Sequence, residues 1–284
     1  MTIKRVGILG SGIMGSGIAE VAAKTGHEVV LRSRQQESAD AMVAALEKSL
    51  AKQVDRGKLS AEESTAVRAR VSATSNLHDL ADCDLVIESV VEDLAIKKEL
   101  FKELDLVVKD SAILATNTST LAVIEMAMVT DRPDRVCGVH FFNPAPMMSL
   151  VEIVRPLSAS DETIAAVAAF ATTCGKDPVE VNDRAGFIVN ALLFPYLNNA
   201  VRMLENGTAS RDDIDTAMKG GCNFPMGPLA LLDLVGLDTS LSILDALYDE
   251  FRDPNYAAVP ALRRMVTAGR LGRKSKLGFY DYAR

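Results

Sequence analysis

Short apolar runs alternate with longer amphipathic stretches over the first two thirds of the chain. Runs of four to eight apolar residues are typical of buried strands, and apolar positions three and four apart are typical of helices packed on one side. We therefore expect strands at residues 4–9, 27–31, 71–73, 84–91, 113–115, 136–139, 150–154 and 178–181. Helices are expected at residues 16–25, 38–55, 60–70, 92–108 and 163–174. This alternation predicts an α/β fold with a Rossmann-type, mostly parallel sheet.

The pattern changes near residues 182–185, and the rest of the chain is predicted to be almost entirely helical. Residues 186–204 are apolar almost all round, which predicts a deeply buried helix, and Pro195 predicts a kink or break in it. Further helices are expected at residues 212–219, 229–235, 240–251 and 258–268, with a turn-rich connector at 220–228. We expect a dinucleotide-binding domain at residues 1–183 and an all-helical C-terminal domain at 184–284, which serves the substrate site and homodimer formation.

Composition argues against several classes of protein. The chain has 284 residues, 48% of them apolar, which suits two domains with cores of their own rather than a disordered protein. A net charge of −7 argues against a nucleic-acid partner. No apolar run approaches the ~18 to 20 residues of a membrane span. The small-residue run at 6–23 is interrupted by five glycines and by Glu20, unlike a signal peptide.

The four cysteines do not suggest a metal site. Cys83, Cys137, Cys174 and Cys222 are widely spaced, without a CxxC motif or a Cys/His pairing. Three of them lie in apolar runs, as small core residues do. Free cysteines of this kind fit a reducing, cytoplasmic compartment.

A glycine-rich turn directly follows the first predicted strand. Gly10, Gly12 and Gly15, with Ile13 and Met14 between them, form a GxGxxG motif between a strand and a helix, which is the context that dinucleotide binding requires. In such a turn the first glycine bends the chain, the second admits a pyrophosphate and the third lets the helix approach the strand. The helix N-terminus then offers N–H groups to the phosphates. The alternative is a glycine-rich turn without a ligand.

The residues after the second predicted strand are unusual for a site that selects NAD. Such sites commonly place Asp or Glu there to accept a hydrogen bond from the ribose 2′-hydroxyl. This chain has Arg32, Ser33 and Arg34 instead, and guanidinium groups bind phosphate well but cannot accept a hydrogen bond. We therefore favour a pocket for the 2′-phosphate of NADP at Ser33 and Arg34. The alternative is NAD with its ribose held by other groups.

Polar residues also follow three later strands. Ser119, His140 and Glu152 bring a hydroxyl, an imidazole and a carboxylate to successive strand ends. Ligands of open α/β sheets sit beyond the carboxyl ends of the strands, so Ser119 and His140 are expected to be neighbours. Each residue has a structural alternative: a core histidine, a serine N-cap, or an ion pair of Glu152 with Arg155. Together, above a nucleotide-binding fold, they favour an active site.

Several blocks of the sequence, taken in order, resemble the L-3-hydroxyacyl-CoA dehydrogenases. They are the GxGxxG turn, Asn117-Thr118-Ser119, His140-Phe141-Phe142-Asn143-Pro144, Glu152, Gly186-Phe187-Ile188-Val189-Asn190 and Pro225-Met226-Gly227-Pro228. The resemblance extends over essentially the whole chain, and the length is similar to that of the stand-alone bacterial 3-hydroxybutyryl-CoA dehydrogenases. The blocks around His140 and Asn190 are specific, whereas the glycine turn alone is not.

The resemblance implies roles for individual residues. His140 is then the catalytic base with Glu152 as its partner, and Ser119 and Asn190 contact the reacting oxygen of the substrate. Positions that line the cofactor in the family correspond to Glu92, Lys97, Asn117, Asn143 and Lys274. We also expect Lys97, like Lys98 and Lys102, to be mostly solvated on its helix. Ser33 stands where the family usually has an acidic residue.

These residue types suit the reversible oxidation of a secondary alcohol. The cofactor carries the hydride, and the protein supplies orientation and proton transfer. Histidine suits the proton because its unperturbed pKa lies near neutrality, and a neighbouring carboxylate fixes its tautomer. We expect His140 to exchange the proton of the 3-hydroxyl while Glu152 orients it. Ser119 and Asn190 hold the oxygen as charge builds on it.

No feature of the sequence identifies CoA directly. We expect a basic patch for an acyl-CoA substrate, acetoacetyl-CoA or 3-hydroxybutyryl-CoA, around Lys52, although a solvated helix face has the same pattern. The other members of this patch are Lys48, Arg56 and Lys58. Two other functions stay open: a dehydrogenase of a free hydroxy acid or sugar acid, and a catalytically silent nucleotide-sensing protein on the same fold.

Overall fold

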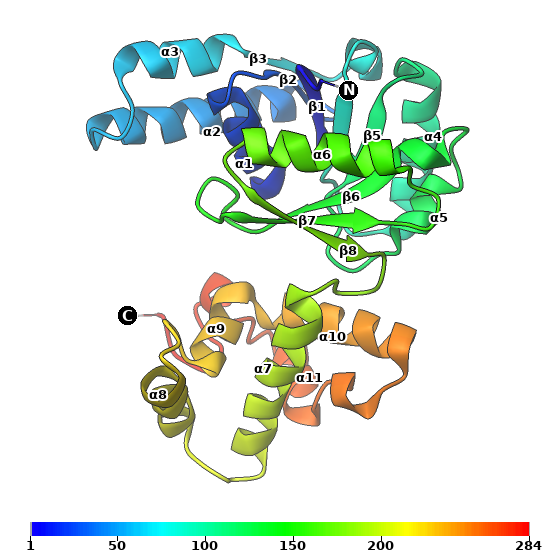
Figure 1. Cartoon of the computed structure of the whole chain (residues 1–284). Helices are drawn as coiled ribbons and strands as arrows, with labels where there is room; N and C mark the ends of the chain where they lie inside the picture. The colour runs from blue at the N-terminus through cyan, green and yellow to red at the C-terminus, as the bar shows by residue number, and fades with distance from the viewer. Residues whose placement is uncertain (1, 284) are drawn as a thin grey trace. The chain divides into compact units, whose positions relative to one another are not determined.

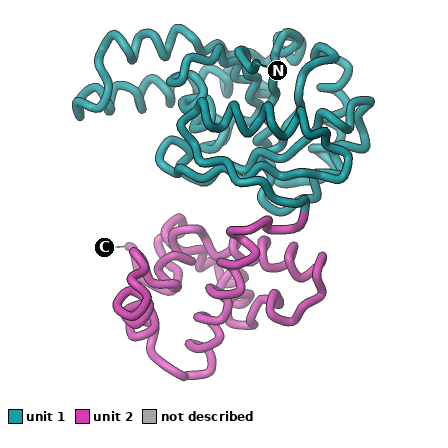
Figure 2. The backbone as a smooth tube through the Cα atoms, in the orientation of Figure 1, with its two compact units in different colours: residues 1–183 teal, residues 184–284 magenta. Residues whose placement is uncertain are grey.

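The structure, a computed structural model, describes residues 2–283 (Figure 1). The chain divides into two compact units, Met1–Asp183 and Arg184–Arg284, which Figure 2 shows in different colours. Each unit has a hydrophobic core of its own. The two units are described in turn because each is a folded body with its own contacts.

The first unit is built on one eight-stranded sheet. Its strands are β1 (Arg5–Leu9), β2 (Glu28–Arg32), β3 (Val71–Thr74), β4 (Leu85–Glu88), β5 (Ile113–Thr116), β6 (Val136–Phe141), β7 (Leu150–Arg155) and β8 (Asp177–Asn182). Their order is β3-β2-β1-β4-β5-β6-β7-β8, and all neighbours are parallel except β6 and β7, which are antiparallel. The predicted α/β fold with a mostly parallel sheet is confirmed.

Helices cover both faces of this sheet. They are α1 (Ile13–Lys24), α2 (Gln36–Asp55), α3 (Ala61–Ala69), α4 (Leu94–Val107), α5 (Val123–Ala127) and α6 (Asp161–Thr173). Ile18 of α1 and Val167 of α6 share a buried core with Val139 of β6. Successive strand residues point to opposite faces, so Val123 of α5, which lies over Gly138, packs on the other face.

The antiparallel hairpin of β6 and β7 corrects one prediction. Glu152 is the third residue of β7 and not a strand end, and the register of the hairpin places it opposite His140. His140 is the penultimate residue of β6. The two residues therefore face each other within the sheet, because the chain reverses between them.

Strand β4 is also shorter than predicted. It ends at Glu88 rather than at residue 91, because the Glu88 carboxylate accepts a hydrogen bond from the backbone N–H of Val90 at 2.6 Å and turns the chain.

Three of the cysteines, Cys83, Cys137 and Cys174, are buried as predicted.

The second unit is helical, as predicted. Its helices are α7 (Val189–Glu205), α8 (Arg211–Cys222), α9 (Pro228–Val235), α10 (Leu237–Phe251) and α11 (Pro260–Thr267). Leu197 of α7, Leu232 of α9 and Leu244 of α10 belong to one core. Helix α8 continues through Gly220 and Gly221, so the turn-rich connector is shorter than expected.

Helix α7 differs from its prediction in three ways. It runs without interruption through Pro195. It is not buried all round, because Leu192 is 72% exposed and Met203 is 44% exposed. The helix also begins later than expected, since Phe187 has a positive φ of 49°. An apolar stripe of α7 therefore faces outward.

Among residues 2–283, no helix is both long and apolar enough to cross a membrane.

Candidate active site

The glycine turn has room for a ligand at one defined place. A Cβ on Gly10, whose φ is +119°, would lie 2.1 Å from the carbonyl oxygen of Ser89, and a Cβ on Gly15 would lie 2.2 Å from the carbonyl of Gly10. A Cβ on Gly12 would meet nothing within 4 Å. Helix α1 begins at Ile13 with no side-chain cap and no acidic residue in its first turn. The turn therefore fits a dinucleotide pyrophosphate at Gly12, with helix amides directed at it.

The end of β2 lines a pocket of about 560 Å³, which Arg32 and Arg34 share with one face of α4. Ser33 is buried, and its backbone N–H donates to Thr74 at 3.1 Å. The Nε of Arg32 is buried without a hydrogen-bond partner among the described residues. Burial lowers the pKa of Arg32 and Arg34 adds to this effect, whereas Glu103 across the pocket opposes it. The guanidinium groups of Arg32 and Arg34 give this end of the pocket two positive charges, which suit an anionic ligand.

A buried ion pair lies behind the turn that follows β4. The ammonium of Lys97 donates to both oxygens of Glu88, at 2.7 and 2.9 Å, and lies 3.2 Å from Glu92. The side chains of Lys97 and Glu88 are 1% and 0% exposed. The expectation that Lys97 is mostly solvated was wrong, because this residue lies on the inner face of α4.

Asn117 ties three strand ends together. It directly follows β5, and its Oδ1 accepts the backbone N–H of Phe141, the last residue of β6, at 2.8 Å. Its Nδ2 donates to the hydroxyl of Ser89, which follows β4, at 3.3 Å. Asn117 therefore fixes the loop after β5 against the end of the strand that carries His140.

Ser119 lies two residues further along the same loop. Its backbone N–H donates to Oε1 of Glu92 at 3.0 Å, and its hydroxyl lies 3.5 Å from the same oxygen. The N-cap of the next helix, α5, is Ala122, so Ser119 is not the helix N-cap that we considered. The Ser119 hydroxyl is thus held near a carboxylate only by a long contact.

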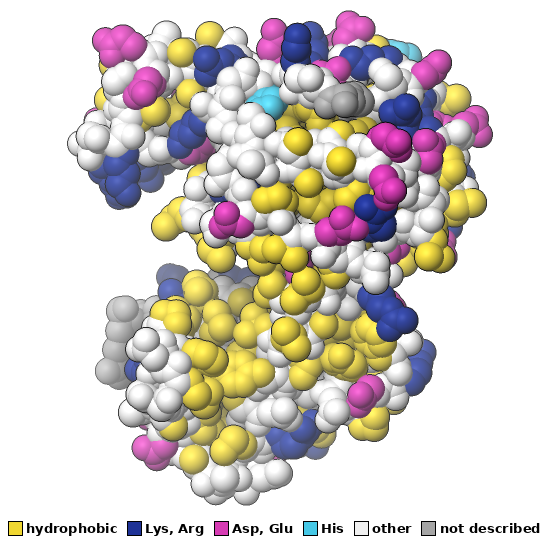
Figure 3. All heavy atoms as spheres, viewed as in Figure 1, with side chains coloured by type: hydrophobic (Ala, Val, Ile, Leu, Met, Phe, Trp, Pro, Cys, Tyr) yellow, Lys and Arg dark blue, Asp and Glu magenta, His cyan; other side chains and the backbone are white. Residues whose placement is uncertain are grey.

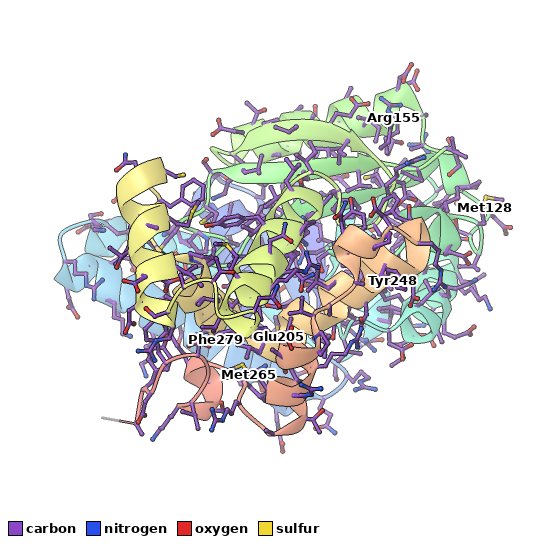
Figure 4. All side chains as sticks on the ribbon, turned by 90° about the horizontal axis from the view of Figure 1, so that it is seen from below. Met128, Arg155, Glu205, Tyr248, Met265 and Phe279 are labelled. Atoms are coloured by element: carbon purple, nitrogen blue, oxygen red, sulfur yellow. The ribbon has the colours of Figure 1, made fainter. Side chains whose placement is uncertain are left out.

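His140 and Glu152 form a buried pair. The Nδ1 of His140 lies 2.7 Å from Oε2 of Glu152, and both side chains are almost completely buried. The ring of Phe142 lies against the imidazole, with 4.5 Å between centroids. Arg155, labelled in Figure 4, pairs with two other carboxylates and not with Glu152. When Nδ1 donates to the carboxylate, Nε2 is the ring nitrogen that can exchange a proton with a substrate.

The backbone of the loop between β6 and β7 is held in place by hydrogen bonds from a buried lysine. The buried ammonium of Lys176 donates to the backbone carbonyls of Ala145 and Met148, both at 2.7 Å. Burial lowers the pKa of Lys176. The exposed Asn143, a predicted cofactor residue, lies in this loop. A Cβ on Gly17 of α1 would approach Ala145 to 3.2 Å, so the loop also packs closely on the dinucleotide helix.

Two predicted site residues belong to the second unit. Asn190 is buried in the first turn of α7, at 7% exposure. The ammonium of Lys274 lies 2.5 Å from a carboxylate oxygen of Asp238.

Lys52, predicted to bind CoA, lies on the exposed side of the last turn of α2 in the first unit. The first unit therefore brings together the glycine turn, Asn117, Ser119, His140 and Glu152 at the carboxyl edge of one sheet.

A further pocket of about 500 Å³ lies in the second unit. It is lined by Glu205, Met265 and Phe279, which lie close together in Figure 4, and by none of the predicted site residues. Among residues 2–283, no group of three or more His, Cys, Asp or Glu side chains is arranged to hold a metal ion.

Sequence reasoning missed Glu88 and Lys176, and it named Arg32 without predicting that this residue is partly buried. A charged residue inside an apolar strand, as Glu88 is, was the one available sign of a buried partner. Lys176 directly follows a glycine before the last strand, where a lysine looks like ordinary surface. The importance of Arg32 rests on its burial, which is a property of the folded sheet.

Two family models match the chain. The model described as "3-hydroxyacyl-CoA dehydrogenase, NAD binding domain" matches residues 5–184, and the model described as "3-hydroxyacyl-CoA dehydrogenase, C-terminal domain" matches residues 186–282. A 3-hydroxybutyryl-CoA dehydrogenase of Clostridioides difficile is 49% identical over 278 residues, which cover 98% of this chain and 99% of that protein.

Solved structures of related enzymes have the same fold as this chain. FadB2 of M. tuberculosis superposes with a TM-score of 0.97 at 48% identity, covering 99% of this chain and 100% of that one. The (S)-3-hydroxybutyryl-CoA dehydrogenase PaaH1 of Ralstonia eutropha has the same TM-score at 42% identity, with 100% of both chains covered.

Proposed function

Because the chain belongs to the 3-hydroxyacyl-CoA dehydrogenase family, we propose that it is a 3-hydroxybutyryl-CoA dehydrogenase. It interconverts the 3-hydroxyl and 3-keto forms of a short-chain acyl-CoA. The observation that carries this proposal is the buried pair of His140 and Glu152 at the carboxyl edge of a dinucleotide-binding sheet. A proton-transfer group at that edge is what an alcohol dehydrogenase needs beside its cofactor.

The residues of the first unit divide the reaction between them. The nicotinamide cofactor supplies the chemistry of hydride transfer when it is bound. His140 takes the proton of the 3-hydroxyl through Nε2 in oxidation and returns it in reduction, while Glu152 fixes the tautomer and stabilises the imidazolium. The hydroxyl of Ser119 donates to the substrate oxygen as negative charge develops on it. The role of Asn190 at the same oxygen stays a prediction from the family.

The cofactor is a nicotinamide dinucleotide, since the first unit belongs to an NAD-binding domain family. Within that class we propose NADP as the preferred form and NAD as a second one. The support is the arginine pair at the end of β2, which lines a pocket there and for which a 2′-phosphate is a suitable acceptor. Glu92, Lys97, Asn117, Asn143 and Lys274 are the further positions that we assign to the cofactor from the family.

We assign the CoA portion to the exposed basic side chains of α2, with Lys52 as the central contact. Three further cations, Lys48, Arg56 and Lys58, lie exposed near the end of this helix. The anionic phosphates of CoA are attracted to such a patch even though the whole chain carries a net charge of −7.

We further propose that the second unit forms a homodimer through its apolar face. A groove of about 700 Å³ lies along α7, with Leu192 and Tyr196 among its lining residues. Figure 3 shows hydrophobic side chains gathered over α7 and α8 on the front of this unit. The buried hydroxyl of Tyr196 has no hydrogen-bond partner among the described residues. Patches of this kind mark interaction surfaces. A cytoplasmic location fits the free cysteines, three of which are buried and one of which, Cys222, is exposed.

A steady-state assay with acetoacetyl-CoA, run with NADPH and with NADH, tests the function and the cofactor together. We expect turnover of acetoacetyl-CoA, a higher kcat/KM with NADPH, and no turnover of free acetoacetate. Turnover of free acetoacetate alone would support the free-acid alternative. Equal or better use of NADH would contradict the NADP assignment while leaving the reaction intact.

A further inference from the structure

The loop at residues 142–149 joins β6 to β7 and so closes the hairpin that carries His140 and Glu152 (Figure 1). Asn143, its second residue, is exposed and is one of the positions that we assign to the cofactor. His140 lies in β6 itself, where it pairs with Glu152 across the register of the hairpin. The position of the loop therefore matters more for the dinucleotide than for the proton-transfer group.

The loop packs closely on α1, the helix that follows the glycine turn. Ala145 is 2% exposed. A Cβ on Gly17 would lie 3.2 Å from the Cβ of Ala145 and 3.3 Å from Cδ of Pro146, so only a glycine leaves the loop this room without a shift. Because α1 begins at the turn that fits a pyrophosphate, this contact sets the loop relative to the cofactor helix.

A second restraint on the loop is the side chain of Lys176. Its ammonium donates to the backbone carbonyls of Ala145 and Met148, both at 2.7 Å. Both carbonyls belong to a turn in which the backbone N–H groups of Met147 and Met148 donate to the carbonyl of Pro144, at 2.9 and 3.1 Å. One ammonium therefore fixes this turn at two points.

The fold holds Lys176 itself in a defined place. The residue lies between α6 and β8, and its backbone N–H donates to the carbonyl of Ala171 in α6 at 3.0 Å. The backbone N–H of the next residue, Asp177, donates to the carbonyl of Ser149 at 2.8 Å. Lys176 thus starts from the rigid sheet and reaches the loop from there.

The burial of Lys176 is unfavourable for the fold. The residue is 8% exposed, and among residues 2–283 no carboxylate pairs with its ammonium. A buried cation without a counter-ion destabilises a protein unless dipoles replace its water. Here two carbonyls of one loop do so. A charge kept in such a position is typical of a group that serves a functional site.

We propose that Lys176 is a positioning residue for the reaction: its two hydrogen bonds hold the loop at residues 142–149 on α1, and the loop presents Asn143 to the dinucleotide. This inference rests on the proposed function and on the cofactor role proposed there for Asn143. Lys176 acts through the backbone of the loop, and its role is separate from those of the glycine turn and of the His140 pair.

The test is Lys176→Met, which keeps an unbranched side chain and removes the donors. The kcat/KM for the dinucleotide is expected to fall about 10- to 100-fold, the effect of displacing a positioning group by about 1 Å. Most of this loss is expected as a rise in the KM of NADPH and of NADH, with the same rise in Kd measured by fluorescence titration. Both dinucleotides are expected to be affected alike, because the loop does not line the pocket of Arg32 and Arg34.

The division between KM and kcat separates positioning from a general loss of structure. Asn117 accepts the backbone N–H of Phe141 at 2.8 Å and so holds the end of β6 without the loop. Phe142, which packs on the imidazole of His140, belongs to the loop. A loss of kcat of no more than about threefold is therefore expected, together with an unchanged KM for acetoacetyl-CoA.

The matched control is Lys109→Met. Lys109 pairs with Asp84 at 2.6 Å and donates to the backbone carbonyl of Asp82 at 3.1 Å, beside the amino end of β4. Its loss is expected to lower the thermal stability and to leave kcat, both KM values and the dinucleotide Kd unchanged. An equal rise in Kd in both variants would assign the effect to stability and overturn the proposal.

Lys176→Gln tests whether the hydrogen bonds or the charge of Lys176 matter. The amide keeps two N–H donors without a charge and is one bond shorter. A rise in Kd of about two- to fivefold is expected, the effect of losing about one neutral hydrogen bond, and thus less than in Lys176→Met. Equal values for the two variants would overturn the proposal. If Lys176→Met does not fold, a wild-type Kd in the folded Lys176→Gln variant refutes it.

A double-variant cycle tests whether Lys176 acts through Asn143. In the Asn143→Ala background, Lys176→Met is expected to raise the Kd by less than about twofold, because the group that the loop presents is already missing. A full additional rise would contradict the proposed route. The result is distinct from a failure of the proposed function, in which the wild type would bind dinucleotide without turning over acetoacetyl-CoA.

Discussion

Glu88 of the first unit and Asp233 of the second are both buried carboxylates, at 0% and 1% exposure, but their partners differ in kind. Glu88 binds two other side chains and one backbone N–H. The oxygens of Asp233 accept the backbone N–H groups of Phe279 and Tyr280, both at 2.8 Å, and the hydroxyl of Tyr282. The first carboxylate organises other side chains, whereas the second holds the C-terminal segment.

The hydrogen-bond networks of Glu88 and Asp233 also end at different kinds of group. The network of Glu88 ends at Glu92, which is partly exposed beside Ser119. Asp233 is enclosed by the segment it binds, since a Cβ on Gly278 would lie 1.9 Å from its Oδ1. Buried charge is therefore not in itself evidence of a functional site. It indicates function where its hydrogen-bond network ends on groups that can meet a ligand.

The sharpest test of this contrast compares two buried histidines of the first unit. The Nδ1 of His27 contacts the carbonyl of Ala22 at 3.2 Å and its ring packs on Phe170, whereas His140 faces Glu152. His140→Ala is expected to lower kcat about 10²- to 10⁴-fold, the usual effect of losing a general acid–base. His27→Ala is expected to lower thermal stability with kcat of the folded enzyme unchanged. Steady-state kinetics with acetoacetyl-CoA decide, and wild-type turnover in His140→Ala would exclude this residue from the mechanism.

A smaller loss is expected for Glu152→Gln, about 10- to 100-fold in kcat. The glutamine oxygen still accepts from Nδ1 of His140 and keeps the tautomer, but the charge that stabilises the imidazolium is gone. The kcat–pH profile should therefore be displaced as well as lowered. Glu180→Gln is the control, because Glu180 lies on the edge strand β8 and pairs with Arg155. A profile identical to that of the wild type would argue against the pair.

Much of the first unit was predictable because its local patterns are strong. The apolar runs located all eight strands, and the GxGxxG motif located the turn at Gly12, since both are short-range properties of the chain. The pairing of His140 with Glu152 was also anticipated. Its geometry was not, because a hairpin that reverses the direction of β7 leaves no mark on the spacing of apolar residues.

The parts that were not predictable depend on distant partners. Lys97 has the spacing of a surface lysine, and only the folded sheet shows that Glu88 lies behind it. Likewise, the all-round apolar pattern of α7 predicted burial, whereas Leu192 is 72% exposed. Sequence alone does not distinguish an apolar face buried in its own core from one that is left for another molecule.

The carboxylate of the second unit gives the next prediction. Asp233→Ala is expected to lower the free energy of unfolding by about 1–3 kcal/mol, because the backbone N–H groups of Phe279 and Tyr280 lose their buried acceptor. Denaturant unfolding measures the change. The control, Asp212→Ala, removes an exposed pair with Arg211 and should have little effect. A loss of kcat in the folded Asp233 variant would contradict the purely structural role.

The same carboxylate predicts a pH effect of defined sign. Burial raises the pKa of Asp233 above its ordinary value of 3.8, and the charge of Asp215 adds to this, while its hydrogen bonds oppose it. The folded state then binds the proton more tightly than the unfolded state. The contribution of Asp233 to stability is therefore complete below pH 3.8 and declines as the pH rises through the raised pKa. The stability difference between the wild type and Asp233→Ala should therefore decrease as the pH rises over that range.

The smallest expected effect concerns the choice between NADH and NADPH at Ser33. Ser33 occupies the position at which NAD-selective sites accept from the ribose 2′-hydroxyl, and Arg32 and Arg34 flank it. Ser33→Asp is expected to move the ratio of kcat/KM values about tenfold toward NADH. The new carboxylate accepts from the 2′-hydroxyl of NADH and repels the 2′-phosphate of NADPH, and one charge-assisted hydrogen bond is worth about that factor.

The control for this change adds the same charge outside the pocket. Ser75→Asp places a carboxylate after β3, at a residue that does not line the pocket of the two arginines. If both variants move the cofactor ratio equally, the effect is a general one of net charge and not of the pocket. If neither variant moves the ratio, the pocket lined by Arg32 and Arg34 does not select between the two dinucleotides, and the NADP assignment is wrong.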